Sequence, residues 1–340
     1  MKLRSALALS ALVSIPALAG CSALTNSDAE PAESDQVTAA FYPLAYATEQ
    51  VAGDRFTVLN LTQPGKEAHD LELSVKATAD IAESALVVYL DGFQPAVDKA
   101  IEQNAKGATL DAAQAVTLEP YDDHGHDEHA GETAEEHAAH ADEDEHEHET
   151  AEEHAAHADE GGHDGHDHGE FDSHFWQDPL KMADFADAVA DELAALDEEH
   201  ADEFAANAAA FRTELEQLDA DYAQTLASCR RDLVVVNHDA FGYLSRYGLE
   251  FETITGLSPG VEPTIADRTR LHDLIADEGI TTVFSESLSS NKAALSVAED
   301  AGVATEVLDP IEGLSDLTRD EDYLSLMRAN LTKLSKANGC

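Results

Sequence analysis

Short apolar runs alternate with stretches of helical periodicity along most of the chain. Runs such as Leu86–Leu90 and Leu233–Val236 carry no charged residue, which is typical of strands buried on both faces of a parallel sheet. Strands are predicted in this way at Thr38–Phe41, Phe56–Leu61, Leu86–Leu90, Leu233–Val236, Phe251–Ile254, Thr281–Phe284 and Thr305–Leu308. Helices are predicted at Pro43–Ala52, Ser74–Ala82, Phe241–Tyr247, around Leu271–Ile275, and at Ala293–Ala301 and Tyr323–Ala337. This alternation predicts an α/β fold of two lobes, each with a parallel-type sheet covered by helices.

Two successive helices separate the two halves. Asp178 followed by Pro179 places an N-cap before a proline at the first helical position. The next helix, residues 199–228, has apolar residues three and four apart and no Gly or Pro, and its length is on the order of 40 Å. We therefore expect a long rigid helix to join an N-terminal lobe, residues 36–198, to a C-terminal lobe, residues 229–340. A single long core helix would give the same pattern.

The N-terminus has the pattern of a secretory signal peptide. Two basic residues precede an apolar run that ends in Leu18-Ala19-Gly20-Cys21. This ending resembles the lipobox of bacterial lipoproteins, in which residues 1–20 would be removed and Cys21 would carry lipid. Residues 21–35 have the composition of a flexible tether. The alternative is an ordinary signal peptide with a chance cysteine. No later segment is apolar for eighteen residues, so no membrane-spanning helix is expected.

Residues 121–170 differ from the rest of the chain in composition. They hold twelve of the 17 histidines and twenty acidic residues but no Lys or Arg, and one twelve-residue unit occurs twice. Imidazole and carboxylate groups are ligands for a borderline cation such as zinc, and the tract has too little apolar mass to form a core. We therefore expect a disordered metal-binding insertion, the alternative being a solvated acidic linker. The histidines of this auxiliary tract are His124, His126, His129, His137, His140, His146, His148, His154, His157, His163, His166 and His168.

Charge and cysteine usage narrow the class of protein. The formal net charge is -51, and such an acidic surface repels phosphate backbones, so no nucleic-acid partner is expected. The charge suits a monomeric protein that meets cations. If Cys21 carries lipid, Cys229 and Cys340 remain, and an even pair outside the cytoplasm is most simply a disulfide. Two unpaired buried thiols are the alternative.

Three of the five histidines outside the tract stand where α/β folds bind ligands. His69 follows the second predicted strand, His238 follows the strand at Leu233, and His174 lies just past the tract. Ligands bind outside the carboxyl ends of parallel strands, and three imidazoles with one carboxylate satisfy a tetrahedral zinc ion. Carboxylates at comparable positions are Asp70, Glu286 and Asp309. Of these, Asp70 and Glu286 would hold the ring N–H groups of the ligands.

Four segments together resemble one family, the zinc branch of the metal-specific solute-binding proteins of ATP-binding-cassette importers. They are Pro64–Glu72, His174–Pro179, Asn237–Tyr243 and Leu308–Pro310, and the resemblance covers about residues 36–338. It implies two α/β lobes joined by a long helix, with the ion in the cleft between them. By motif match it implies the ligands His69, His174, His238 and Asp309. Ala68 stands where some members have a glutamate ligand, which favours Asp309 over Glu286 or water as the fourth ligand.

The resemblance also implies a function. The protein would be lipid-anchored on the outer face of the cytoplasmic membrane, capture Zn²⁺ as cargo and deliver it to an ATP-binding-cassette permease and its ATPase. No catalysis is expected, and affinity should fall below about pH 6.5 as the imidazoles become protonated. The alternatives are a surface zinc store or adhesin with the same fold, a carrier of another divalent metal such as manganese, and a zinc hydrolase with Glu286 as general base.

Overall fold

The structure is a computed structural model that describes residues 35–121, 171–257 and 259–340. The predicted signal peptide, Cys21 with nearly all of its tether, and the twelve histidines of the auxiliary tract lie outside the described residues. Within the described parts of the chain, no helix is long and apolar enough to cross a membrane.

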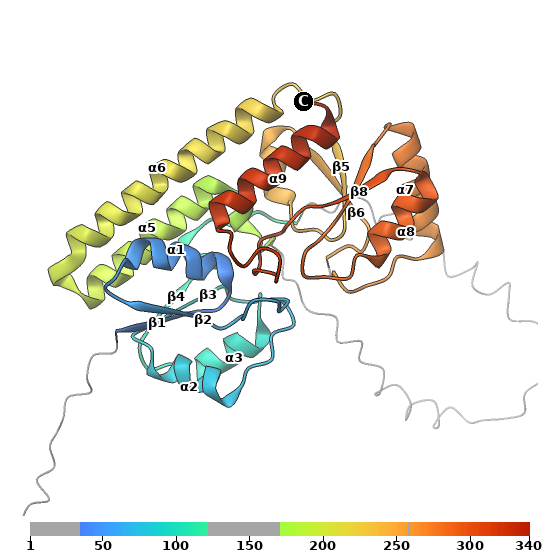
Figure 1. The fold of residues 1–340 in the computed structure, drawn as a ribbon. Coiled ribbons are helices and arrows are strands. Elements are labelled where there is room, and N and C mark those ends of the chain that lie inside the picture. The colour runs from blue at the N-terminus through green and yellow to red at the C-terminus, as the bar shows by residue number, and fades with distance from the viewer. Residues whose placement is uncertain (1–34, 122–170, 258) are drawn as a thin grey trace, which may run out of the picture. The chain divides into compact units, whose positions relative to one another are not determined.

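The first lobe is built on a sheet of four parallel strands in the order β2-β1-β3-β4. The strands are β1 (Gln36–Ala39), β2 (Thr57–Asn60), β3 (Leu86–Tyr89) and β4 (Ala108–Asp111). The helices are α1 (Tyr42–Ala52), α2 (Val75–Glu83), α3 (Pro95–Asn104) and the short α4 (Ala112–Ala115). Helix α1 lies on one face of the sheet and α2 and α3 on the other (Figure 1). The predicted strands and helices are confirmed here, whereas α3, β4 and α4 are additional elements that the pattern did not predict.

Helices connect this sheet to the second one. The 3-10 helix η4 (Phe175–Gln177) leads into α5 (Pro179–Leu196), whose N-cap Asp178 accepts a hydrogen bond from Leu180 N as predicted. After the 3-10 helix η5 (Glu198–His200), the helix α6 (Ala201–Leu226) runs for 26 residues. It packs on α1 and α5 and then on α9, so the predicted long helix joins the two lobes along a buried face.

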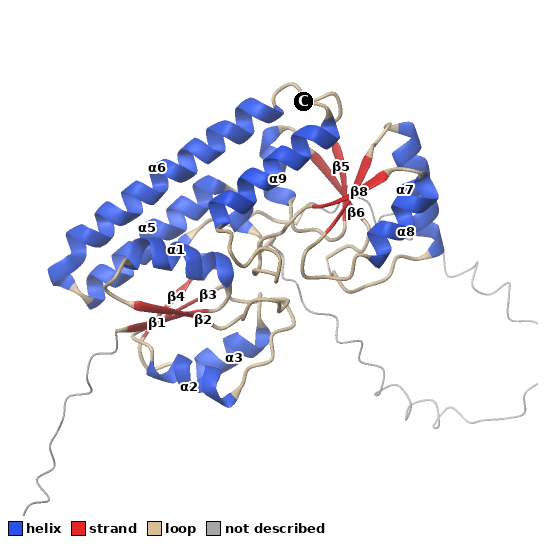
Figure 2. Cartoon of the chain, viewed as in Figure 1, coloured by secondary structure: helices blue, strands red, loops and turns tan. Residues whose placement is uncertain are grey.

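The second lobe repeats the topology of the first, with strand order β6-β5-β7-β8. The strands are β5 (Leu233–Val236), β6 (Glu250–Thr253), β7 (Thr282–Ser285) and β8 (Ala304–Val307). The helices are α7 (Ile265–Asp277), α8 (Lys292–Ala301) and α9 (Tyr323–Asn338), and the predicted helix at Phe241–Tyr247 is the 3-10 helix η6 (Gly242–Tyr247). Figure 2 shows both sheets with helices packed around them, as the α/β prediction requires.

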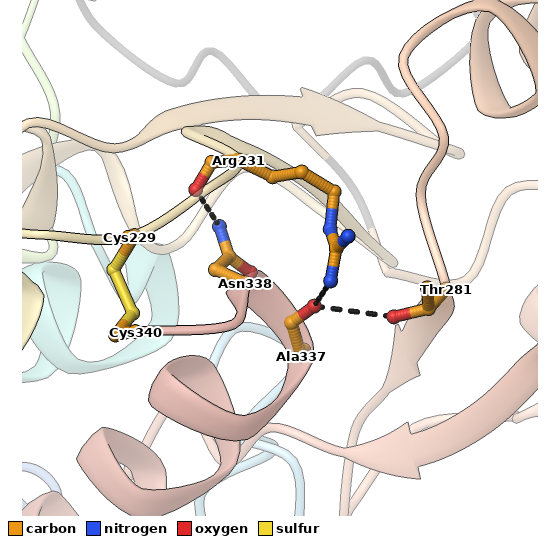
Figure 3. Close-up of a disulfide and its surroundings, with 6 residues drawn as sticks. All are labelled: Cys229, Arg231, Thr281, Ala337, Asn338 and Cys340. Carbon is orange, nitrogen blue, oxygen red and sulfur yellow. Dashed lines mark hydrogen bonds between the residues drawn. A yellow bond between two sulfur atoms is a disulfide. The ribbon is translucent and has the colours of Figure 1, made fainter.

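A disulfide fastens the end of the chain to the start of the second lobe. Cys229, just before β5, is bonded to Cys340, just after α9, so the predicted pair is confirmed (Figure 3). Hydrogen bonds reinforce the same junction, because Arg231 Nη2 donates to Ala337 O at 2.6 Å and Asn338 Nδ2 donates to Arg231 O at 3.0 Å. The carboxyl end of α9 is therefore fixed to the sheet by covalent and polar contacts together.

Candidate metal centre

Three predicted histidines and one glutamate that was not predicted come together beyond the strand ends. His69 lies in the loop after β2, His174 immediately before η4, His238 two residues after β5, and Glu312 in the loop between β8 and α9. One ligand atom from each of the four residues lies within 4.8 Å of all the others. Glu312 Oε1 is 3.4 Å from Nε2 of His69, 3.4 Å from Nε2 of His174 and 3.3 Å from Nε2 of His238. The four side chains thus point at one spot.

These polar atoms are removed from water. The side chains of His69, His174, His238 and Glu312 are 8%, 1%, 0% and 3% exposed. Among the described residues, Nε2 of His174, Nε2 of His238 and Oε1 of Glu312 are buried atoms without a hydrogen-bond partner. Leaving such a group unsatisfied costs about 1–3 kcal/mol, so three of them at one point need a common partner. Imidazole nitrogens and a carboxylate oxygen are the donor set for a zinc ion.

Two carboxylates orient the rings of the second and third histidines. Asp172 Oδ1 lies 2.8 Å from His174 Nδ1 and accepts from His174 N at 2.9 Å. Glu286 Oε1 lies 2.5 Å from His238 Nδ1 and accepts from His238 N at 3.0 Å. With each Nδ1 beside a carboxylate, Nε2 is the atom that faces the centre, and it would give its lone pair to a metal ion once its proton is displaced. Glu286 thus lies beside a ring N–H as predicted, whereas Asp172, which holds this position at His174, was not predicted. Asp70, the other carboxylate predicted for such a role, is exposed.

Opposite charges at the centre outweigh the effect of burial on the pKa values of its residues. Burial opposes protonation of His174, but the neighbouring Asp172 and Glu312 outweigh it and raise the pKa of His174 to about 9. In the same way, burial is outweighed by Glu286 and Glu312, so the pKa of His238 is well above its usual value. Burial favours a neutral Glu312, yet the three imidazoles outweigh this and hold the pKa of Glu312 well below its usual range. The carboxylate is an anion here, and a metal ion binding to these imidazoles displaces protons.

An apolar wall lines one side of the centre. The ring of Phe93 lies 4.4 Å from that of His69, and the ring of Trp176 lies 5.2 Å from that of His174, between ring centroids. Phe93 and Trp176 in turn contact each other at 5.6 Å. Such a wall excludes water and lowers the local effective dielectric constant, which strengthens the attraction between a cation and the Glu312 carboxylate.

Asp309, the predicted fourth ligand, lies outside the group of four. Its Oδ1 accepts from Ile311 N at 2.9 Å, and its backbone exchanges two hydrogen bonds with the Asn330 side chain, at 3.0 and 2.7 Å. The chain then turns at Ile311, with φ of 62°, and this turn brings Glu312 to the histidines. The carboxylate that meets the three histidines is therefore that of Glu312, three residues after Asp309. The sequence did offer one signal for Glu312, because this glutamate stands between Ile311 and Gly313 in the same loop as Asp309.

Known proteins are similar to this chain in sequence and in fold. The zinc-binding lipoprotein AdcA of Streptococcus pneumoniae is 31% identical over 306 residues, which cover 88% of this chain and 55% of AdcA. The high-affinity zinc uptake system protein ZnuA of Bacillus subtilis is 26% identical over 305 residues, covering 88% of this chain and 86% of that protein. The crystal structure of the Zn(II)-bound ZnuA-like domain of Streptococcus pneumoniae AdcA matches with a TM-score of 0.67 and 29% identity, over 90% of this chain and 98% of that one.

The match covers only part of the AdcA proteins but nearly all of the described residues of this chain. This chain spans about half the length of the AdcA proteins that it matches. The profile of the ZnuA family, described as zinc-uptake complex component A, periplasmic, matches residues 37–337, which include both sheets and all four residues of the centre. The chain therefore belongs to the ZnuA family of solute-binding transport proteins.

Proposed function

We propose that the protein captures a zinc ion outside the cytoplasm with His69, His174, His238 and Glu312, and delivers it to an ATP-binding-cassette permease driven by its ATPase. The observation that carries this proposal is the convergence of three Nε2 atoms on one carboxylate oxygen, 3.3–3.4 Å away, in a buried site. Three neutral imidazoles and one carboxylate suit tetrahedral Zn²⁺, whereas manganese prefers more oxygen ligands. The names of the relatives, a zinc-binding lipoprotein and a zinc uptake protein, support the same cargo.

Capture and release of the ion require no covalent bond to be made or broken in this site. A catalytic zinc ion keeps an open position for water, while four protein ligands complete the tetrahedron. Glu286, the general base in the hydrolase alternative, is engaged by His238 and also accepts from Ser289 Oγ at 2.9 Å. A binding protein rather than an enzyme is therefore the proposal that this geometry supports best.

The segments outside the described residues complete the proposal. Cys21 would anchor the protein by lipid at the outer face of the cytoplasmic membrane, and the histidines of residues 122–170 would collect zinc with lower affinity near the centre. This division of labour rests on the composition of the tract and on the resemblance of Leu18–Cys21 to a lipobox.

Native mass spectrometry of the purified protein during a zinc titration tests the proposal. With a competing chelator present, we expect one ion that stays bound and several that are removed easily. The tightly bound ion should disappear in His238→Ala but persist in His272→Ala, a control in which an exposed histidine on α7 is removed. If the tight ion survived His238→Ala, or if all ions were removed together, the centre would not be the zinc site. The same titration with Mn²⁺ distinguishes the manganese alternative.

A further inference from the structure

The carbonyl of Pro310 accepts two side-chain hydrogen bonds from helix η4. Trp176 Nε1 donates to Pro310 O at 2.8 Å, and Gln177 Nε2 donates to the same oxygen at 2.6 Å. Both side chains are fully buried. Pro310 precedes Glu312 by two residues, and η4 follows His174 directly. Two donors on one backbone oxygen thus connect the segment that carries one proposed ligand to the segment that carries another.

The turn that aims Glu312 is strained. Ile311 has φ of 62°, the only positive value for a residue other than glycine among the described residues. Positive φ is a genuine outlier for a β-branched residue, and it persists only where the surrounding structure enforces it. Asp309 and Asn330 hold the turn from the side of the second lobe, through the hydrogen bonds given above. The Trp176 and Gln177 donors hold it from the other side.

The two donors are themselves held in place. The Tyr323 hydroxyl of α9 donates to Trp176 O at 2.5 Å, and the Trp176 ring packs edge-on against Phe41 with centroids 5.0 Å apart. Packing alone does not explain a glutamine at position 177, because its Oε1 is a buried atom without a hydrogen-bond partner in the described parts of the chain. A buried amide that leaves one atom unsatisfied is costly, and an apolar side chain would fill the same space without that cost. Its remaining contribution is the bond to Pro310 O.

We propose that Gln177 and Trp176 are positioning residues that hold Glu312 against the three histidines by fixing the Pro310 carbonyl. The inference rests on the proposed zinc site and adds to it how the fourth ligand is kept in place. Glu312 is held in its binding orientation before the ion arrives, so ordering this turn does not reduce the free energy of zinc binding. Loss of either donor should let the strained turn relax and move the carboxylate away from the imidazoles.

A double-mutant cycle with Glu312 separates this role from ordinary packing. Gln177→Met removes the donor and keeps a long unbranched side chain, and we expect it to weaken Zn²⁺ affinity about tenfold, the usual scale for an outer residue that orients a metal ligand. In the Glu312→Ala background the same substitution should change affinity less than about twofold, because there is no carboxylate left to position. Competition with a fluorescent zinc chelator measures all four affinities.

The matched control is Gln217→Met on the exposed face of α6, where the amide donates to Asp221, and it should leave zinc affinity unchanged. An equal loss from Gln177→Met in both backgrounds, or no loss in either, would overturn the inference and leave Gln177 a packing residue. If Gln177→Met does not fold, Trp176→Phe, which keeps an aromatic ring and removes the Nε1 donor to Pro310 O, serves in the same cycle. Unchanged zinc affinity in Glu312→Ala alone would instead refute the proposed ligand set.

Discussion

The two lobes have the same strand order, but different chemistry follows their central strands. In the first lobe the residue that follows β1 is the apolar Ala40, and Phe41 next to it packs on Phe93 and Trp176. In the second lobe the equivalent strand β5 is followed by Asn237 and His238, and β7 by Glu286. The end of β1 therefore contributes to the apolar wall, whereas the ends of β5 and β7 contribute to a polar network that also includes Asp172 and His174 from the first lobe. Equal topology fixes where side chains meet, and the residues after each strand decide whether they pack or orient ligands.

The apolar wall should contribute mainly to folding. Phe93→Ala removes a side chain that is 6% exposed and packs on Phe41, Trp176 and His69, so we expect a loss of roughly 3–5 kcal/mol in the free energy of unfolding. Denaturant titration with and without zinc measures it. If the wall acts by packing, the metal-free and metal-bound proteins lose similar amounts. A loss confined to the zinc-bound protein would show that the wall acts on the ion instead.

The polar network predicts a large difference between two neighbouring carboxylates. Glu312→Gln replaces an anionic ligand by a neutral amide, and we expect zinc affinity to fall on the order of 100-fold, about 2.7 kcal/mol. Asp309→Asn keeps the oxygen that accepts from Ile311 N, so affinity should change less than about threefold. Isothermal titration calorimetry with a competing chelator compares the pair. The reverse order of effects would restore Asp309 as the ligand.

Carboxylates that only orient a ring should have a smaller effect. Asp172→Asn and Glu286→Gln remove the charge beside His174 Nδ1 and His238 Nδ1 but leave the Nε2 atoms in place, and each should weaken zinc binding about tenfold. Both variants should also bind zinc with the same stoichiometry as the unchanged protein. Loss of the bound ion in native mass spectra would mean that one of these carboxylates is itself a ligand.

Sequence reasoning succeeded where a local pattern carried the information. Buried strands such as β3 and β5 are nearly continuous apolar runs, and His69, His174 and His238 stand out because few histidines lie outside the tract. Strand β4 was missed because its four residues, Ala-Thr-Leu-Asp, have no such run and become a strand only by pairing with β3. Tertiary pairing of this kind overrides local propensity.

The fourth carboxylate of the centre was missed for a different reason. Asp309 follows the last strand directly, as the rule for strand ends suggests, and the motif match favoured it too. Which carboxylate faces the histidines depends on the positive φ of Ile311, and no pattern of apolar and polar residues encodes that turn. Asp172 was missed similarly, because its contact with His174 comes from a local loop that has no periodic signal.

The smallest predicted effect concerns a contact between the two lobes, beside the polar network. The Tyr243 hydroxyl, on η6 of the second lobe, donates to Asp172 O at 2.8 Å and accepts from Glu119 N at 3.0 Å. Tyr243→Phe removes both bonds while keeping the ring, so we expect a loss of about 1 kcal/mol in unfolding free energy and a two- to threefold faster release of zinc, since Asp172 orients His174. Stopped-flow release into excess chelator measures the rate, with Tyr247→Phe, whose hydroxyl bonds Asp219, as the matched control. Equal release rates in the two variants would mean that the polar network ends at Asp172 and does not extend through η6.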